Sequence, residues 1–340
     1  MLWSWAASHH KTLGYLLGRT WDTVWYVGII QHGYDSGTPL FSNMAFFPLF
    51  PYAARGLTLV SPLSAPDAAI AVAWIAGAVA AWGLYAVGNL LHDRRTGIVL
   101  AMLWGALPHA VTESMGYSEG LFTALAAWTL YYVLTERWLA AGTLCLLAGL
   151  TRPTAVALIP AVCLAALIAL VRRRAGLRAA AAIVLAPLGW LGYLAFVAHR
   201  THHLDGWFRI QKLGWGSGFD GGVYTLREGR TVLGREMPLD LYLVTLVLAV
   251  AVLLFVLSVL DRQPWPLLVY SGLLLAVTLG GSGYYNAKAR FLVVAFPLLL
   301  KPAVALAHAR RGTVVSVLVF LTLVSAYCGG YLLLVWNHSP

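Results

Sequence analysis

The feature that most constrains this chain is a succession of long apolar runs separated by short charged connectors. Runs of membrane-spanning length begin near Ala68, Ile98, Gly120, Trp138, Thr154, Ala179, Leu241, Pro266, Phe291 and Thr313. A helix needs about 20 apolar residues to cross the hydrocarbon core of a bilayer, and only 11% of the 340 residues are charged. The sequence therefore predicts an all-α polytopic membrane protein, a single domain over residues 1–340 with about ten transmembrane helices.

The charged connectors predict how these spans are oriented. Most of the short-loop arginines fall on alternate connectors, at residues 92–95, 136–137, 172–178, 261–262 and 308–311. Short arginine-rich loops face the cytoplasm, so two large outer loops, residues 1–66 and 199–240, are predicted on the extracytoplasmic face. Basic loops of this kind report membrane orientation, so the net charge of +10 does not indicate a nucleic-acid partner, and none is expected.

The first outer loop has no complete span before it. Only MLWSWAAS, residues 1–8, could be the remnant of an initial helix. No signal peptide is expected, because a basic region followed by a sufficient apolar core is lacking. The sequence therefore predicts that most of a first helix has been cut off, although the next span could also translocate a short tail.

Two aromatic stretches in the first outer loop predict helices that lie at the membrane interface. The stretch WDTVWYVGIIQHGY, residues 21–34, is predicted to form a short helix that begins at Thr20. One face of this helix holds Asp22, Tyr26, Ile29 and Gly33, and its other faces carry Trp21 and Trp25. FSNMAFFPLFPY, residues 41–52, is a very apolar segment interrupted by two prolines. Aromatic residues around a short apolar helix favour an interfacial position, and the two segments could together roof a cavity.

Asp22 has two compatible interpretations. Thr20 could cap the helix, and an aspartate in the first turn suits the helix dipole. Alternatively, Asp22 is a general base near the headgroups, where its carboxylate takes a proton from an acceptor hydroxyl.

Two glutamates lie at the outer ends of neighbouring spans, in PHAVTESMGYSEGLF, residues 108–122. A carboxylate at that depth is costly unless it is wetted or paired. Ser118 followed by Glu119 also fits an ordinary helix N-terminus. We favour a site-supporting role for Glu119 and the ordinary interpretation for Glu113.

Three basic residues are candidates for binding an anionic headgroup. Arg152 is isolated between two apolar runs, and Lys288 and Arg290 lie beside glycines and two tyrosines in GGSGYYNAKARF, residues 280–291. An arginine that faces a cavity can bind phosphate or carboxylate in bidentate fashion. The alternative is ordinary interfacial anchoring by basic and aromatic side chains.

Metal and nucleotide sites are not predicted. The stretch HRTHHLD, residues 199–205, matches no recognised zinc spacing, and no glycine-rich nucleotide loop is present. Cys145, Cys163 and Cys328 each lie inside an apolar run and are interpreted as core residues. No cofactor is assigned, and a divalent cation is left open.

Four stretches, taken in order, resemble the PIG-V-like mannosyltransferases, relatives of GPI mannosyltransferase II in the GT-C class of membrane glycosyltransferases. They are WDTVWYVGIIQHGY, AFFPLFP at residues 45–51, GYSEGLF at residues 116–122, and Gly-Leu-Thr-Arg at residues 149–152. Their order and spacing agree with the family over roughly the first half of the chain. One departure is the turn TRPTA, residues 151–155, where relatives often carry Asn-Gly after the arginine.

The resemblance implies a GT-C fold with interfacial helices in the first outer loop. It also implies a polyprenyl-phosphate sugar donor, typically carrying mannose, and transfer on the outer face of the membrane. The family's Trp-Asp pair maps onto Trp21 and Asp22, its Ser-Glu pair onto Ser118 and Glu119, and its arginine onto Arg152.

The expected mechanism places Asp22 as the general base for an acceptor hydroxyl on a glycolipid or protein. The other candidate side chains would bind the leaving phosphate (Arg152, Lys288 and Arg290), orient the sugar or the base (Glu119 and His32), or shape the pocket (Trp21, Trp25 and Tyr26). One rival is a transporter or flippase for lipid-linked sugars, which would need a polar path through the middle of the membrane. The other rival is a non-catalytic binding protein.

Overall fold

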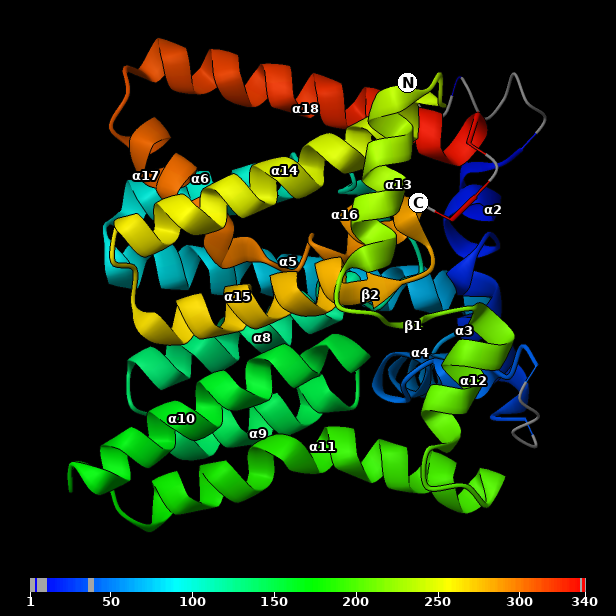
Figure 1. The fold of residues 1–340 in the computed structure, drawn as a ribbon, viewed down its shortest axis with the longest axis horizontal. Helices are drawn as coiled ribbons and strands as arrows, with labels where there is room; N and C mark the ends of the chain where they lie inside the picture. Colours follow the sequence, from blue (N-terminus) through cyan, green and yellow to red (C-terminus); the bar gives the residue numbers. More distant parts are fainter. Residues whose placement is uncertain (1–3, 5–10, 36–39, 337, 340) are drawn as a thin grey trace.

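The protein is a bundle of helices that run along a common direction. The computed structural model describes residues 4, 11–35, 40–336 and 338–339, and Figure 1 shows most of the long helices side by side across the view. In this described part, the strands are β1 (Gly218–Phe219) and β2 (Gly281–Ser282), which pair antiparallel. MLWSWAAS, apart from Ser4, lies outside the described residues.

Each of the ten apolar runs predicted from the sequence begins within a helix or directly beside one. The bundle helices are α5 (Ala65–Leu91), α6 (Arg94–Gly105), α8 (Glu119–Leu134), α9 (Trp138–Gly149), α10 (Leu158–Val171), α11 (Leu177–Thr201), α14 (Leu239–Leu260), α15 (Trp265–Gly280), α17 (Leu300–Ala307) and α18 (Arg311–Leu334). The helical fold class is thereby confirmed.

Length and composition identify fewer membrane-crossing helices in the structure than the ten predicted from the sequence. Among the described residues, five helices are long and apolar enough to cross a bilayer: Ala65–Leu91, Pro153–Val171, Leu177–Thr201, Leu239–Leu260 and Arg311–Leu334. A sixth arises if the pair Tyr285–Phe291 and Phe296–Ala307, bent by 70°, forms one broken span. Helices α9 and α15 are apolar but shorter, so ten spans remain a prediction.

Helices α9 and α11 pack closely because glycines line their contact. A Cβ atom on Gly142 would lie 2.7 Å from the Cα atom of Ala182, and one on Gly149 would lie 2.6 Å from the backbone nitrogen of Trp190. Small residues at such spacing let helix backbones approach each other in a membrane. The contact fixes the end of α9, where the chain turns toward Arg152.

The charged connectors from which the orientation is predicted lie together at one end of the bundle. The arginine-rich connectors gather at the end where α10 meets α11 and α17 meets α18 (Figure 1). There Arg95 Nη2 donates to the carbonyl of Ala309 at 2.9 Å, and Lys301 forms an ion pair with Asp261. The assignment of this end to the cytoplasm remains a prediction from the charge pattern.

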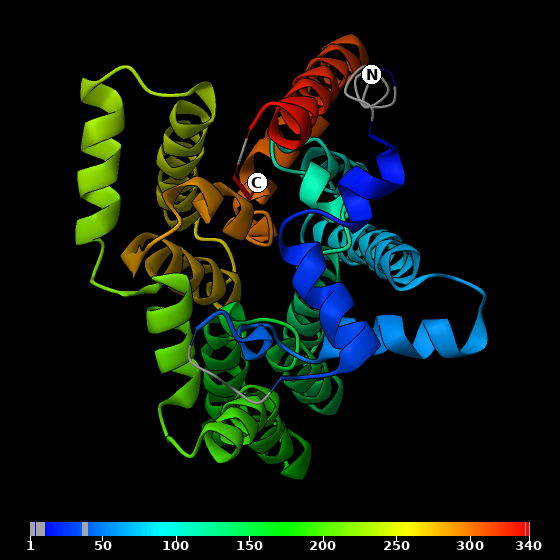
Figure 2. The ribbon, with the colours of Figure 1, turned by 90° about the vertical axis from the view of Figure 1, so that its right-hand side faces the viewer.

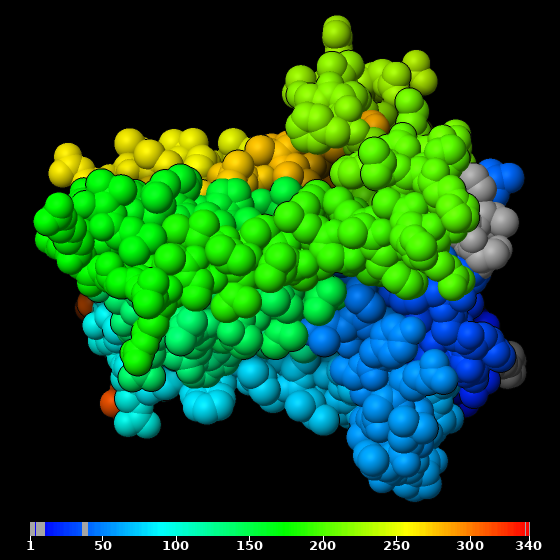
Figure 3. Space-filling model, turned by 90° about the horizontal axis from the view of Figure 1, so that it is seen from below, coloured from blue at the N-terminus to red at the C-terminus, as the bar shows by residue number. Residues whose placement is uncertain are grey.

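The opposite end carries the longer connecting segments, seen end-on in Figure 2. Short elements there are α2 (Leu13–Gly18), α3 (Asp22–His32), η1 (Asn43–Ala45), α4 (Leu49–Val60), α7 (Val111–Ser114), η2 (Pro153–Ala157), α12 (Gly206–Trp215), α13 (Val223–Gly234), η3 (Tyr285–Ala287) and α16 (Lys288–Phe291). The remaining short element, η4 (Phe296–Leu299), packs against α6, α14 and α15 directly before α17. Figure 3 shows α4 (blue) and α13 (yellow-green) projecting from opposite sides. The projecting tip of α4 is apolar, with Leu59 79% and Val60 82% exposed.

Aromatic packing ties the first outer loop to the second. The Trp25 ring lies 6.1 Å from Phe46 and 5.0 Å from Trp215, and Tyr26 packs edge-on against Phe46 and Phe50. Tyr26 and Phe50 are buried and the other three rings are half-buried, and such large rings contribute much of the apolar contact in a small interface. Helix α3 is therefore held as a roof between η1, α4 and α12.

Candidate active site

Four charged side chains from distant parts of the chain meet beneath α3, and we call them the charge network: Asp22, Glu119, Arg152 and Arg290. Arg290 Nη2 lies 2.8 Å from Asp22 Oδ2, and its Nε lies 3.3 Å from Glu119 Oε1. Arg152 Nη1 approaches the same Glu119 oxygen at 2.7 Å. One glutamate therefore holds two guanidinium groups, and one of these reaches the aspartate.

The charge network is buried and formally neutral. The exposed fraction of the side chain is 2% for Glu119, 6% for Arg290 and 10% for Arg152, whereas it is 23% for Asp22. Buried charges persist only when they are paired, because removal from water is costly. Asp22 is the member that an incoming molecule can reach most readily.

Each member lies where a helix begins or breaks. Asp22 and Glu119 occupy the first turns of α3 and α8, where the helix dipole favours a carboxylate. Arg152 follows the end of α9, and Arg290 lies in α16 just before the 70° bend. The meeting of these ends concentrates charge without placing it in the middle of a regular span.

Helix α3 begins differently from the sequence-based expectation. It starts at Asp22 after Trp21, which has a φ of 54° and no capping side-chain bond. The predicted cap by Thr20 is wrong, because the Thr20 hydroxyl instead donates to the carbonyl of Leu16 at 2.6 Å. Strained non-glycine backbone of this kind concentrates at functional sites.

The neutral hydroxyl groups of Ser118 and Tyr26 lie beside the charge network. Arg152 Nη1 donates to the Ser118 hydroxyl at 3.2 Å, and the hydroxyls of Ser118 and Tyr26 lie 2.8 Å apart. Ser118 makes no capping bond to α8, so the interpretation of Ser118 as an ordinary side-chain cap is wrong. The Ser118 hydroxyl instead bonds the side chains of Arg152 and Tyr26.

Tyr117 supports the site in a way that the sequence reasoning missed. The Arg290 guanidinium lies 5.1 Å from the centre of the Tyr117 ring, a cation–π arrangement. The backbone N–H of Asp22 donates to the Tyr117 hydroxyl at 3.3 Å, and burial raises the pKa of this phenol. The sequence contains one indication of this role, because Tyr117 lies in GYSEGLF directly before the Ser-Glu pair.

The last part of the chain also reaches Arg290. Arg290 Nη1 donates to the Ser339 hydroxyl at 3.0 Å, and Asn286 Nδ2 donates to the Ser339 carbonyl at 2.8 Å. No local pattern in the sequence links these residues, so this contact had no sequence signal.

The remaining residues singled out from the sequence lie outside the charge network. Trp21 packs beside Tyr117, and Trp25 belongs to the aromatic roof. His32 is exposed in the last turn of α3, about 15 Å along the helix from Asp22. Lys288 is 2% exposed, and its ammonium donates to the carbonyls of Thr278 and Gly281 at 2.6 and 2.7 Å.

Two further titratable groups lie nearby, the buried His109 and the half-buried Glu113. His109 is 2% exposed, and its Nε2 has no hydrogen-bond partner among the described residues. Burial, with the positive charge of Arg290, lowers the pKa of His109 to about 4. Burial, with the negative charge of Glu119, raises the pKa of Glu113, so these groups favour their neutral forms.

The neutral state of His109 predicts how stability depends on pH. Its pKa falls from 6.5 to about 4 on folding, so the unfolded chain binds more protons between these values. Stability should therefore be complete above about pH 6.5 and decline by about 3 kcal/mol as the pH falls toward 4. Unfolding of detergent-solubilised His109→Asn should show a shallower decline than the wild type, and equal slopes would contradict the assignment.

The side chains that could hold a cation are dispersed over the described residues or face guanidinium groups. In the part of the chain that the structure describes, no three His, Cys, Asp or Glu side chains lie together in a metal-binding group. His203 Nδ1 instead lies 3.1 Å from Arg209 Nη1, and Asp22 and Glu119 both face guanidinium groups. We therefore derive no chemical step through a cation.

Comparison with known proteins relates the fold, not the sequence, to a solved structure. The sequence matches no protein-family model and no curated protein. The structure is similar to ArnT from Cupriavidus metallidurans bound to undecaprenyl phosphate, with a TM-score of 0.56 and 15% identity. The match covers 89% of this chain and 57% of that one. At this identity the likeness shows the fold alone, which is the helical fold of that protein.

Proposed function

We propose that the protein is a membrane glycosyltransferase that moves a sugar from a polyprenyl-phosphate donor to an acceptor hydroxyl on the extracytoplasmic face. The observation that carries the proposal is the charge network at one end of a GT-C type bundle. Similarity to a protein solved with undecaprenyl phosphate supports this class of donor. The PIG-V-like motifs favour mannose as the sugar, and the acceptor is a glycolipid or a protein.

In the proposed reaction, Asp22 acts as the general base. Its carboxylate takes the proton from the acceptor hydroxyl, and the acceptor oxygen attacks the anomeric carbon of the sugar. The bond from that carbon to the phosphate oxygen breaks, and the electron pair leaves with the polyprenyl phosphate. One displacement inverts the anomeric centre. The partial exposure of Asp22 supports this role, because the acceptor must reach its carboxylate.

Arg290 is the proposed partner of the leaving phosphate. Preorganised cations stabilise charge that develops in the transition state, and Arg290 lies beside the proposed base. Among the described residues, the hydrogen bond of its Nη1 goes to the neutral hydroxyl of Ser339, which a phosphate oxygen could replace. Glu119 would keep Arg290 and Arg152 in position. Lys288 would act indirectly, because its ammonium holds the loop before α16.

Arg290→Lys tests the phosphate assignment while keeping a positive charge beside Asp22 and Glu119. The lysine loses the planar fork that binds two phosphate oxygens. We expect the KM for the polyprenyl-phosphate donor to rise by at least about tenfold, or about 1.4 kcal/mol, with a smaller change for the acceptor. Initial rates at varied donor and acceptor concentrations measure both constants.

Arg227→Lys is the matched control, because Arg227 is an exposed arginine at the same end of the bundle. Its donor KM should stay at the wild-type value. Equal effects of Arg290→Lys on donor and acceptor would place the phosphate elsewhere.

Product formation separates this proposal from a transporter or a binding protein. Purified protein in liposomes, supplied with a labelled polyprenyl-phosphate sugar and candidate acceptors, should release free polyprenyl phosphate and a glycosylated product. Movement or retention of intact donor without product would reject the transferase. Mass-spectrometric comparison of glycolipids and glycoproteins with and without the gene product would then identify the acceptor.

A further inference from the structure

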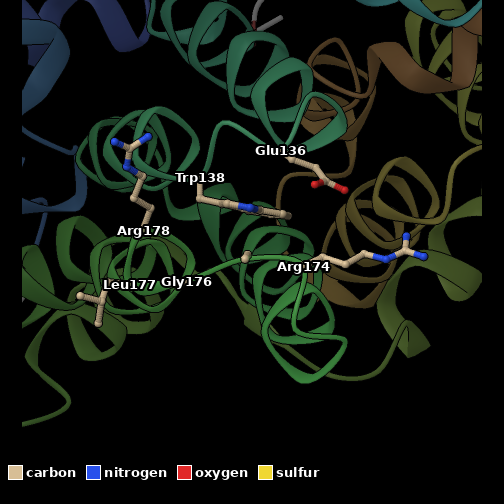
Figure 4. A pocket seen from close by; sticks show the side chains of 7 residues that line it. Glu136, Trp138, Arg174, Gly176, Leu177 and Arg178 are labelled. Carbon is tan, nitrogen blue, oxygen red and sulfur yellow. The ribbon is translucent and has the colours of Figure 1, made fainter.

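A second basic site lies at the end of the bundle opposite Asp22. Figure 4 shows a pocket between the α8–α9 and α10–α11 connectors, with Arg174 and Arg178 on either side of Trp138. Its volume is about 430 Å³, and Glu136, Gly176 and Leu177 also line it. None of these residues belongs to the charge network.

The pocket is surrounded by arginines whose positive charge is not neutralised by an ion pair within the described residues. The two connectors and the first turn of α11 hold one acidic residue, Glu136, and five arginines: Arg137, Arg172, Arg173, Arg174 and Arg178. Within residues 11–35, 40–336 and 338–339, none of these six side chains forms an ion pair. Lys301 and Asp261, at the same end of the bundle, do pair. Unpaired guanidiniums beside a cavity favour an anionic ligand.

A phospholipid has a charged headgroup followed by apolar chains, and this site has a charged pocket followed by apolar helix surfaces. Gly176 precedes α11 without a side-chain cap, so first-turn N–H groups add to the arginines. Beyond the pocket, the sides of α10 and α11 carry exposed apolar residues: Leu164, Leu167, Ile168, Val184, Leu188 and Leu191. A soluble anion would use only the charged rim, whereas a lipid would also cover these side chains.

We propose that this pocket binds an anionic phospholipid of the leaflet opposite the candidate active site. Arg174 and Arg178 hold the phosphate, Trp138 forms the floor at headgroup depth, and the acyl chains lie along α10 and α11. Basic pockets between membrane helices are known to recognise anionic lipid headgroups in this way, and aromatic residues prefer this depth. The site is independent of the proposed sugar transfer.

The test is lipid retention by the full chain, measured by native mass spectrometry. Wild-type protein should retain phosphatidylglycerol but not phosphatidylcholine, and Arg174→Gln/Arg178→Gln should retain at least about tenfold less phosphatidylglycerol. The control, Arg310→Gln/Arg311→Gln, changes two exposed arginines at the same end of the bundle and should behave as the wild type. Soluble glycerol phosphate should not bind.

Thermal unfolding gives a second measurement that does not depend on whether the lipid stays bound in the vacuum of the mass spectrometer. Phosphatidylglycerol should raise the Tm of the wild type and of the control, but not that of the pocket variant. Equal losses in both variants would mean a general effect of positive charge and would overturn the site. Unchanged retention by the pocket variant, or tight binding of glycerol phosphate, would also overturn it.

Discussion

Asp22→Asn is expected to lower the rate of sugar transfer by about 10²- to 10⁴-fold, the usual contribution of a positioned general base. Asparagine has nearly the same shape but cannot accept the proton of the acceptor hydroxyl. Its amide oxygen can still accept a hydrogen bond from Arg290, which lies 2.8 Å from the carboxylate. The loss should therefore appear in kcat, measured by single-turnover transfer from a polyprenyl-phosphate sugar, with little change in donor binding.

The matched control for this variant is Asp67→Asn. Asp67 is also an aspartate in the first turn of a helix at the same end, but it is exposed, and its carboxylate accepts a hydrogen bond from the Ser64 cap. It should keep the wild-type rate. A folded, membrane-inserted Asp22→Asn protein with near-wild-type transfer would show that the base is another group.

Glu119→Gln is expected to destabilise the protein more than any other single substitution in the site. It removes the charge that faces both Arg152 and Arg290, whose side chains are only 10% and 6% exposed. Breaking a buried ion pair from one side costs about 3–5 kcal/mol, because the remaining charge stays buried without its partner. Unfolding in detergent, followed by circular dichroism against denaturant or temperature, measures the loss.

Glu228→Gln is the corresponding control. Glu228 pairs with Arg227 at 3.4 Å, but the two side chains are 31% and 68% exposed, and such surface pairs contribute about 0–1 kcal/mol. A change of that small size for Glu119→Gln would contradict the buried pairing. Adding Arg152→Met to Glu119→Gln should restore part of the stability, since it removes one of the two stranded charges.

The helical fold class can be predicted from the sequence because each helix forms for a local reason. A run of apolar residues must satisfy its backbone hydrogen bonds internally in a membrane, so it becomes a helix wherever its neighbours are placed. Interruptions are harder to predict: the bend of 70° between Tyr285–Phe291 and Phe296–Ala307 lies in one apolar run. Its geometry depends on packing against α14 and α15.

The members of the site could be named from the sequence, but their arrangement could not. Asp22, Glu119, Arg152 and Arg290 attract attention because isolated charges are rare in apolar surroundings. Which of them pair depends on contacts between segments that are far apart in the chain. Lys288 illustrates the difficulty, since its charge and position resemble those of Arg290, yet its ammonium binds backbone carbonyls.

The order of the charge network along the chain has a consequence for biogenesis. Asp22, Glu119 and Arg152 are all synthesised and inserted before Arg290, the residue that joins Asp22 to the others. Chains fold from the N-terminus as they emerge from the ribosome. The helix that carries Asp22 is therefore inserted before Arg290, its partner in the ion pair, has been synthesised. A nascent chain arrested before residue 290 should expose an unpaired Asp22 to membrane quality control.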